Sequence, residues 1–397
     1  MSGSNSLWHW KLAVSNLLMP GCVAWLFIFP MGCVWETPVP PVEPARACID
    51  AKTVLRQAMD SEEPATRSHA IEALAQTMGA QSGPEFVQSL SDSSVGVQFA
   101  AAMAIGDTRY ALGKEPLLKM AGDPTLDKNV MTAVIYALYR LGDDQYANRL
   151  GQLLFYPTDK WVRANSAMVM GRMGDRSAVG PLKSEYDDEQ DPTVKIQLAE
   201  ALALLQEQRE AAHLEAYVNS PYLDERMIAI PALAKARPFQ SRQLLTNLVD
   251  SSQQPLLVRI QAAGALAKNG IVSEDSYNLC IQTVKDPQGV LEKSQEWRND
   301  QTPAMQAMTI RSIQSLAAMS LGQMKQSRAV DVLHPLLDNP DGAVRAAAAM
   351  SILKLLPAYA SPPAAQPAQA MPPPSQKSSP ARPTAPAAML RRSGGKD

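Results

Sequence analysis

The sequence is poor in the residue types that build disulfide frameworks, metal centres and aromatic cores. Its 397 residues include four cysteines and four histidines, and aromatic residues make up 6% of the chain. No Cys-x-x-Cys, His-x-x-x-His or His-Glu pair occurs, although such spacings are typical of metal sites. We therefore expect no metal ion, and we interpret the histidines as surface or packing residues: His9, His69, His213 and His334.

Motifs for nucleotide binding and acyl transfer are also missing. The chain contains no Gly-x-Gly-x-x-Gly, no Walker loop and no Gly-x-Ser-x-Gly, the loops that hold phosphates or expose a nucleophile. No alternating run of Val, Ile and Thr bounded by turn residues predicts a strand. We therefore expect an all-α, non-enzymatic protein without a cofactor or a small-molecule substrate.

The sequence does contain a recurring two-residue signature, an apolar residue followed by a basic one. The clear copies are Val162-Arg163, Val194-Lys195, Val258-Arg259, Ile310-Arg311 and Val344-Arg345, and the weaker ones are Thr66-Arg67, Val97-Gln98, Val130-Met131 and Met227-Ile228. Except for one step, successive copies lie 31 to 34 residues apart. A period in this range indicates a helical repeat protein.

Each copy opens an Ala-rich helical run, and an acidic residue stands three positions before five of them. These five residues are Asp127, Asp159, Asp191, Asp224 and Asp341. A carboxylate just before a helix accepts hydrogen bonds from the first free N–H groups, which is worth about 1 kcal/mol. A second amphipathic run precedes each cap, for example at residues 150–155 and 244–249. The predicted unit is therefore helix, capped turn, helix.

This unit resembles the HEAT repeat. The likeness rests on the Asp-x-x-Val-Arg/Lys turn and the Ala-rich second helix, and it covers roughly residues 50–357. It implies a right-handed α-solenoid of about nine helical hairpins that binds proteins on the concave face of its second helices. An open solenoid would keep Cys48 and Cys280 apart. Because some HEAT-like proteins are enzymes, an accessory or lyase-like subunit acting on a bound cofactor or client enzyme is the alternative.

The recurring cations have two interpretations. They could line a positive stripe, or each could bond across the stack to a capping Asp one repeat away, and the in-phase Asp residues favour this structural ladder. The residues concerned are Arg163, Lys195, Arg259, Arg311 and Arg345. The chain carries a net charge of −2, the tail after residue 357 carries +4 and residues 1–49 carry zero, which leaves −6 for the repeats. An acidic body disfavours nucleic-acid binding.

One step of the period is too long. Val258 and Ile310 lie 52 residues apart, about 20 more than one unit, and the excess falls near residues 286–303. Insertions in repeat arrays map to loops, often on a binding face. Trp297 and Arg298 in this insert are of types enriched in binding hot spots, so they are candidate partner-binding residues. A lengthened helix or a harmless loop is the alternative interpretation.

The N-terminus differs from the repeats. No charged residue occurs between Lys11 and Glu36, which is typical of a secretory signal or a membrane anchor. Gly32-Cys33 at the end of this stretch resembles a bacterial lipoprotein signal, which makes Cys33 the candidate site of lipid attachment. An uncleaved anchor and simple secretion stay open, and a cytosolic adaptor with an N-terminal partner-binding helix is the further alternative.

These observations predict four segments. Residues 1–33 form a signal peptide or membrane anchor, residues 34–47 a stiff Pro-rich linker, residues 48–357 the HEAT solenoid, and residues 358–397 a disordered, basic tail rich in Pro, Ala and Ser. The expected protein is a scaffold that is tethered in a bacterial cell envelope and binds protein partners outside the cytoplasm.

Overall fold

A computed structural model describes residues 41–156, 158–294 and 302–360 of the chain. The described residues from Val42 onward belong to one compact unit. Every regular element among these described residues is a helix, which confirms the all-α prediction. The expected N-terminal signal with Cys33, the insert residues Trp297 and Arg298, and the tail from residue 361 lie outside the described residues.

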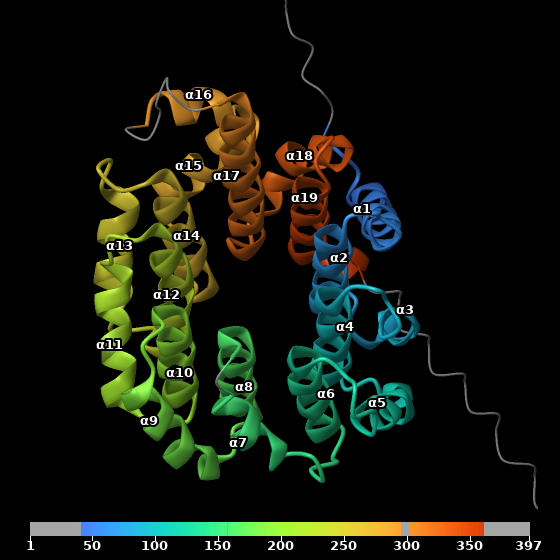
Figure 1. Cartoon of the computed structure of the whole chain (residues 1–397). Coiled ribbons are helices and arrows are strands. Elements are labelled where there is room, and N and C mark those ends of the chain that lie inside the picture. The colour runs from blue at the N-terminus through green and yellow to red at the C-terminus, as the bar shows by residue number, and fades with distance from the viewer. Residues whose placement is uncertain (1–40, 157, 295–301, 361–397) are drawn as a thin grey trace, which may run out of the picture. The chain divides into compact units, whose positions relative to one another are not determined.

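The helices form an inner and an outer layer (Figure 1). The inner helices are α2 (Pro64–Thr77), α4 (Val95–Thr108), α6 (Lys128–Arg140), α8 (Lys160–Met173), α10 (Pro192–Leu204), α12 (Leu223–Ala236), α14 (Leu256–Lys268), α17 (Pro303–Gln323) and α19 (Gly342–Leu355). The outer helices are α1 (Pro44–Met59), α3 (Gly83–Ser89), α5 (Lys114–Ala121), α7 (Arg149–Leu154), α9 (Val179–Asp188), α11 (Gln208–Val218), α13 (Arg242–Asp250), α15 (Glu274–Lys285) and α18 (Val330–Leu333). Short 3-10 turns precede α3, α5, α9 and α18, and another, His334–Asp338, continues α18.

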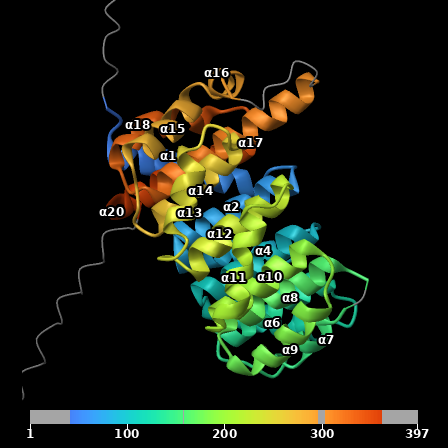
Figure 2. The same ribbon diagram turned by 90° about the vertical axis from the view of Figure 1, so that its left-hand side faces the viewer.

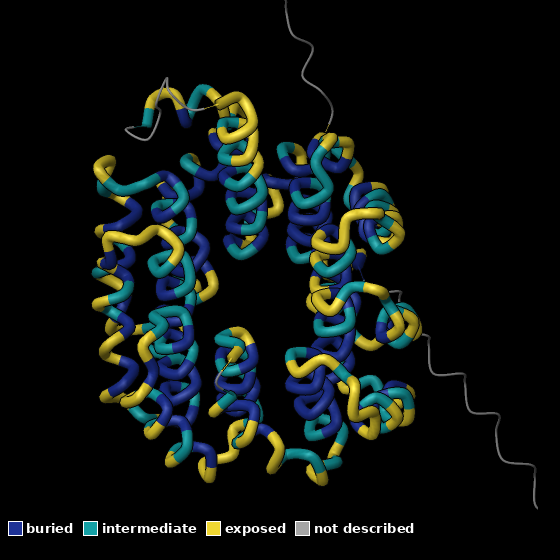
Figure 3. The backbone as a smooth tube through the Cα atoms, in the orientation of Figure 1, coloured by how far each residue is buried: buried dark blue, intermediate teal, exposed yellow. Residues whose placement is uncertain are grey.

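Each outer helix and the inner helix that follows it form one repeat, and the core lies where their apolar faces meet. Figure 3 shows buried residues concentrated along these contacts and exposed residues in the turns. Most inner helices are extensively buried, because helices pack against them from both neighbouring repeats and from the outer layer. Neither helix of a hairpin could bury its face alone, so stacking supplies the core.

Small residues set the closest approaches between neighbouring inner helices. A Cβ atom on Gly106 of α4 would lie 2.9 Å from Cα of Ala137 on α6, and one on Gly171 of α8 would lie 2.6 Å from Cα of Ala201 on α10. Real Cβ atoms do not approach backbone this closely, so only glycine permits these two contacts.

The last repeat packs against the first, so the described unit is a closed ring (Figure 1). Helix α19 contacts both α1 and α2, Lys354 Nζ donates to Gln76 Oε1 over 2.7 Å, and His334 Nε2 lies 3.1 Å from Asp50 Oδ2. We call this contact the closing joint. The expectation of an open solenoid is therefore wrong, because the curvature of the stack brings its two ends together.

Three further segments bear on the predicted boundaries of the solenoid. Residues 44–47, expected in the extended linker, form the first turn of α1, and Ala47 is fully buried there. The insert contributes the short helix α16 (Pro287–Glu292) and an N-terminal extension of α17, which projects beyond the neighbouring helices (Figure 2) and agrees with the alternative interpretation of a lengthened helix. Residues 358–360, expected in the disordered tail, belong to helix α20 (Pro357–Ala360), in which Ala360 is buried.

Candidate functional site

Capped turns between outer and inner helices line one edge of the ring, which we call the turn rim. The side chains of Asp127, Asp159, Asp191 and Asp341 accept hydrogen bonds from the first N–H groups of α6, α8, α10 and α19, respectively. These caps set where each inner helix begins. The turn rim comprises the turns at residues 60–63, 90–94, 122–127, 155–156, 158–159, 189–191, 219–222, 251–255 and 339–341, together with the first residues of the inner helices that follow them and the N-terminal extension of α17.

The fifth predicted cap, Asp224, is wrong. Helix α12 has Tyr222 as its N-cap, and Asp224 lies within its first turn. The turn is closed instead by the Ser220 hydroxyl, which accepts from the Tyr222 N–H over 3.1 Å and donates to the Glu225 carboxylate over 2.5 Å. Glu225-Arg226 therefore occupies the signature position of this repeat, two residues before the predicted Met227.

The signature predicted at Ile310-Arg311 is shifted by three residues. Helix α17 begins earlier, at Pro303, and the residue buried in the repeat core is Ile313 rather than Ile310. Gln314 donates to Val284 O over 3.0 Å, much as Arg226 donates to Val218 O in its own repeat. Arg311 is exposed on the turn rim, 3.5 Å from Asp341.

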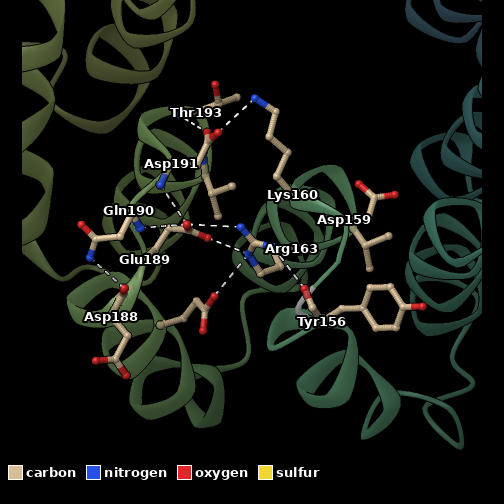
Figure 4. A network of polar contacts seen from close by, with 12 residues as sticks. Tyr156, Asp159, Lys160, Arg163, Asp188, Glu189, Gln190, Asp191 and Thr193 are labelled. Atoms are coloured by element: carbon tan, nitrogen blue, oxygen red, sulfur yellow. Dashed lines mark hydrogen bonds and ion pairs between the residues drawn. The ribbon is translucent and has the colours of Figure 1, made fainter.

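A network around Arg163 joins the turn rim of one repeat to that of the next (Figure 4). Arg163 Nε lies 2.6 Å from Glu189 Oε2 and 3.5 Å from Glu185 Oε1, and Nη2 donates to Glu189 Oε1 over 3.2 Å. Its Nη1 donates to Tyr156 O in its own turn. One guanidinium thus links two largely buried carboxylates of α9 and its following turn to the turn before α8.

This environment shifts the pKa values of the two carboxyl groups in opposite directions. Burial and the neighbouring Glu189 raise the pKa of Glu185. Burial acts to raise the pKa of Glu189 as well, but hydrogen bonds from Arg163 and from the N–H groups of Asp191 and Gln190 outweigh it and hold that pKa below its usual value. Glu189 is therefore the charged partner that anchors the network.

Other ion pairs repeat this arrangement along the rim. We call this series of ion pairs between successive turns the ladder. Arg67 makes a bidentate pair with Asp92 at 2.7 and 2.8 Å, and Lys160 Nζ lies 3.0 Å from Asp191 Oδ2. The predicted ladder residues behave less uniformly. The ammonium group of Lys195 lies over the Tyr186 ring. The side chains of Arg259 and Arg345 donate hydrogen bonds to backbone carbonyls of their own repeats.

Exposed apolar side chains gather on the turn rim. Eleven large apolar residues in the described part are exposed, and seven of them lie in the rim turns or the first helical residues beside them, including the N-terminal extension of α17. These seven are Val95, Phe155, Trp161, Tyr222, Leu223, Met305 and Met308. Phe239, 89% exposed, lies beyond the opposite end of α12. The turn rim is therefore the more apolar edge of the ring.

The inner wall of the ring holds a cavity of about 280 Å³ lined by residues of inner helices alone: α2, α12, α14, α17 and α19. Lys268 and Lys354 contribute its charged groups, and Leu316, Met319 and Met350 contribute apolar surface. Burial and then repulsion by Lys268 lower the pKa of Lys354 to about 8. Sequence reasoning missed this site, because its residues converge only when the ring closes.

One position of the inner helices carries cations in five repeats. It lies ten residues after the signature residue, at Arg140, Arg172, Lys235, Lys268 and Lys354. In α4 the same position holds Asp107, which accepts a hydrogen bond from the Tyr136 hydroxyl over 2.6 Å. Burial and this hydrogen bond raise the pKa of Tyr136 to about 12. This second periodicity was available in the sequence, and it predicts a basic band inside an acidic protein.

Metal-binding clusters and membrane spans are both missing from the part of the chain that the structure describes. Its residues contain no group of three His, Cys, Asp or Glu side chains placed to hold a metal ion. Within the same ranges, no helix combines the length and the apolarity that a membrane span needs. Cys48 and Cys280 are buried, free thiols.

Comparison with known proteins agrees with the repeat architecture. A family model of HEAT repeats matches residues 147–234 and 303–371, and the search of curated proteins found no match. Similar solved structures include the complex of CpcE and CpcF of phycocyanin lyase from Nostoc sp. PCC7120, with 16% identity, a TM-score of 0.34 and coverage of 68% of this chain and 94% of that one. Human deoxyhypusine hydroxylase in complex with glycerol has 17% identity, a TM-score of 0.29 and coverage of 63% and 98%. From its helical hairpins and the family match, the chain contains HEAT repeats, which the family model finds at residues 147–234 and 303–371.

Proposed function

We propose that this chain is a non-enzymatic protein-binding scaffold that contacts its partner through the turn rim. The observation that carries the proposal is the concentration of exposed apolar side chains along this one edge. Exposed Trp and Tyr side chains are the types that most often dominate binding energy. Trp161, 54% exposed, and Tyr222, 64% exposed, are the residues on which we expect the contact to depend.

The ladder supports the proposal because it holds the rim in one shape before binding. Arg163 and Lys160 tie the turn before α8 to the turn before α10, so little conformational entropy is lost when a partner docks. The exposed carboxylates Asp187 and Asp188 lie at the end of α9, between the repeats that carry Trp161 and Tyr222. The rim therefore suits a partner with apolar and basic residues.

Affinity capture with matched variants tests this proposal. The double variant Trp161→Ala/Tyr222→Ala should lose most of the partner recovered by the native chain, while Phe239→Ala should recover it fully. Phe239 is more exposed than Trp161 and Tyr222, but it lies beyond the opposite end of α12. Equal recovery by the double variant and the native chain, at unchanged melting temperature, would contradict a partner site on the rim.

We also propose that the scaffold is exported and tethered in a bacterial cell envelope by its N-terminal segment. The uncharged stretch between Lys11 and Glu36, ending in Gly32-Cys33, supports this part of the proposal. Treating cells with globomycin should cause an unprocessed precursor to accumulate, and Cys33→Ser should have the same effect without the drug. A chain that fractionates with the cytoplasm under all conditions would refute export and leave the rim proposal to its own test.

A further inference from the structure

The inner cavity beside the closing joint has the size and lining of a small-molecule site. Its volume is about 280 Å³, close to the lower end of ligand pockets at about 300 Å³. Leu316, Met319 and Met350 form an apolar wall, while Gln261 and Gln323 add amide groups from α14 and α17. The mixture of a broad apolar wall with a few polar groups is the usual composition of such sites.

The charged groups of the cavity are both cations. Lys268 comes from α14 and Lys354 from α19, and no Asp or Glu is among the residues that line the cavity. Lys354 Nζ donates to the neutral Gln76 Oε1 over 2.7 Å. Burial and repulsion by Lys268 destabilise the charged form of Lys354, yet with a pKa of about 8 it stays mostly protonated at neutral pH. Two ammonium groups therefore share a concave site whose lining offers no carboxylate.

No carboxylate is among the groups that shift the pKa of Lys354. A second cavity of about 110 Å³ adjoins the first through Gln76, Met319 and Met350, and α2 contributes His69 and Glu72 to its lining. Water reaches the Glu72 side chain, but the protein atoms packed around it raise its pKa, and His69 acts in the opposite direction. On α12, Lys235 bonds to Glu200 over 2.9 Å, and α17 contributes no titratable residue to either lining.

We propose that this cavity binds a small organic carboxylate. The carboxylate group bridges Lys268 and Lys354, and the apolar part of the ligand lies against Leu316, Met319 and Met350. A carboxylate adds the attraction of opposite charges to this hydrogen bond, which the bond from Lys354 to the uncharged Gln76 amide lacks. Binding also stabilises the protonated amine. This site is independent of the proposed rim contact, so either proposal can fail alone.

Calorimetric titration of the full chain with sodium octanoate tests the proposal. Lys268→Met and Lys354→Met should each weaken binding at least tenfold, and Lys354→Arg should restore most of it. Lys235→Met is the matched control, because Lys235 occupies the same helix position but pairs with Glu200, and it should change the affinity less than twofold. Octanol and inorganic phosphate should bind much more weakly, since each lacks one half of the recognised chemistry.

The pH dependence provides a second readout that a merely structural role would not produce. Because the pKa of Lys354 is about 8 in the free protein and a carboxylic acid is ionised well above about pH 5, octanoate affinity should be nearly constant from about pH 6 to about pH 7 and should begin to fall near pH 8. It should then fall by up to tenfold per pH unit above it, and the Lys354→Arg variant should lack this fall. No octanoate binding by the native chain, equal binding by the Met variants, or phosphate binding as tight as octanoate would overturn the proposal.

Discussion

The ring contains two kinds of joint: the one between α8 and α10, which are successive inner helices, and the closing joint between α19 and the first repeat. At the successive joint, Arg163 bridges two carboxylates of the next repeat. At the closing joint, Arg345 occupies the same position but donates to carbonyls of its own turn, at Asn339 and Pro340. The polar contacts that cross the closing joint include Lys354 with Gln76, His334 with Asp50, and the Val42 N–H with Asp331.

The ladder and the closure of the ring therefore depend on different contacts. The closing joint buries Cys48 and Ala51 of α1 almost completely and places Gly342 against Thr66, so apolar packing and small residues hold it. The ladder fixes each repeat on its neighbour, and the curvature that results brings the two ends within packing distance. Closure therefore does not require the charged contacts that define the successive joints.

The largest effect should follow from removing the cation of the successive joint. Arg163→Met leaves Glu185 and Glu189 largely buried, with side-chain exposures of 10% and 6%, and without their common partner. Breaking a buried pair on one side costs about 3–5 kcal/mol, and the urea midpoint should fall accordingly.

An exposed pair supplies the control for this variant. Arg328 bonds to Glu274, and both side chains are more than half exposed, so Arg328→Met should cost less than about 1 kcal/mol. Similar losses for Arg163→Met and Arg328→Met would show that the ladder adds no special stability to the successive joint.

Glycine substitutions compare the packing of the two joints. In Gly171→Ala the new Cβ meets Ala201 Cα at 2.6 Å, and backbone cannot move aside, so we expect a loss of about 1–3 kcal/mol. In Gly342→Ala it meets side-chain atoms of Thr66, Oγ1 at 2.7 Å and Cγ2 at 2.9 Å, rather than backbone, so the loss should be smaller. Thermal melting measures both, and a larger loss for Gly342→Ala would reverse the predicted order.

Gly151 on the outer helix α7 is the control for these two variants. No atom lies within 4 Å of the position that its Cβ would take. Gly151→Ala should therefore raise the stability by up to about 1 kcal/mol, because alanine favours the helix and restricts the unfolded chain. A loss in this variant would mean that helix propensity and open space do not govern these substitutions.

The cap at Asp191 has a smaller effect and two separable parts. Asp191 accepts from the N–H groups of Thr193 and Val194 and pairs with Lys160. Asp191→Ala should cost about 1 kcal/mol through the lost cap, whereas Asp191→Asn keeps a capping oxygen and should cost only part of this. An unchanged urea midpoint in the Ala variant would contradict the assigned start of α10.

The sequence predicted the repeat unit because its determinants are local. A cap and the buried valine three residues later lie within one turn, as at Asp127 and Val130. The prediction failed where another local device replaced the cap, as at Ser220 before α12, and where an insert lengthened α17 so that Ile313 rather than Ile310 entered the core.

Ring closure and the inner cavity could not be derived in the same way. Closure depends on the small rotation between repeats, which adds up over the whole stack, and no single motif encodes it. Gly171 marks a close approach, but its meaning depends on Ala201 in the next repeat. Lys268 and Lys354 share a repeat position, yet only the folded ring brings them to one cavity.

The smallest predicted effect concerns the polar pair of the closing joint. The side chains of His334 and Asp50 are 27% and 25% exposed, and a pair so accessible to water contributes less than about 1 kcal/mol. His334→Ala should therefore leave the radius of gyration from small-angle X-ray scattering unchanged, because the packing of α1 against α19 is untouched. Amide hydrogens of α1 should exchange somewhat faster, while those of α8 and α10 keep their native rates. An expanded particle in this variant would show that the pair, and not apolar packing, closes the ring.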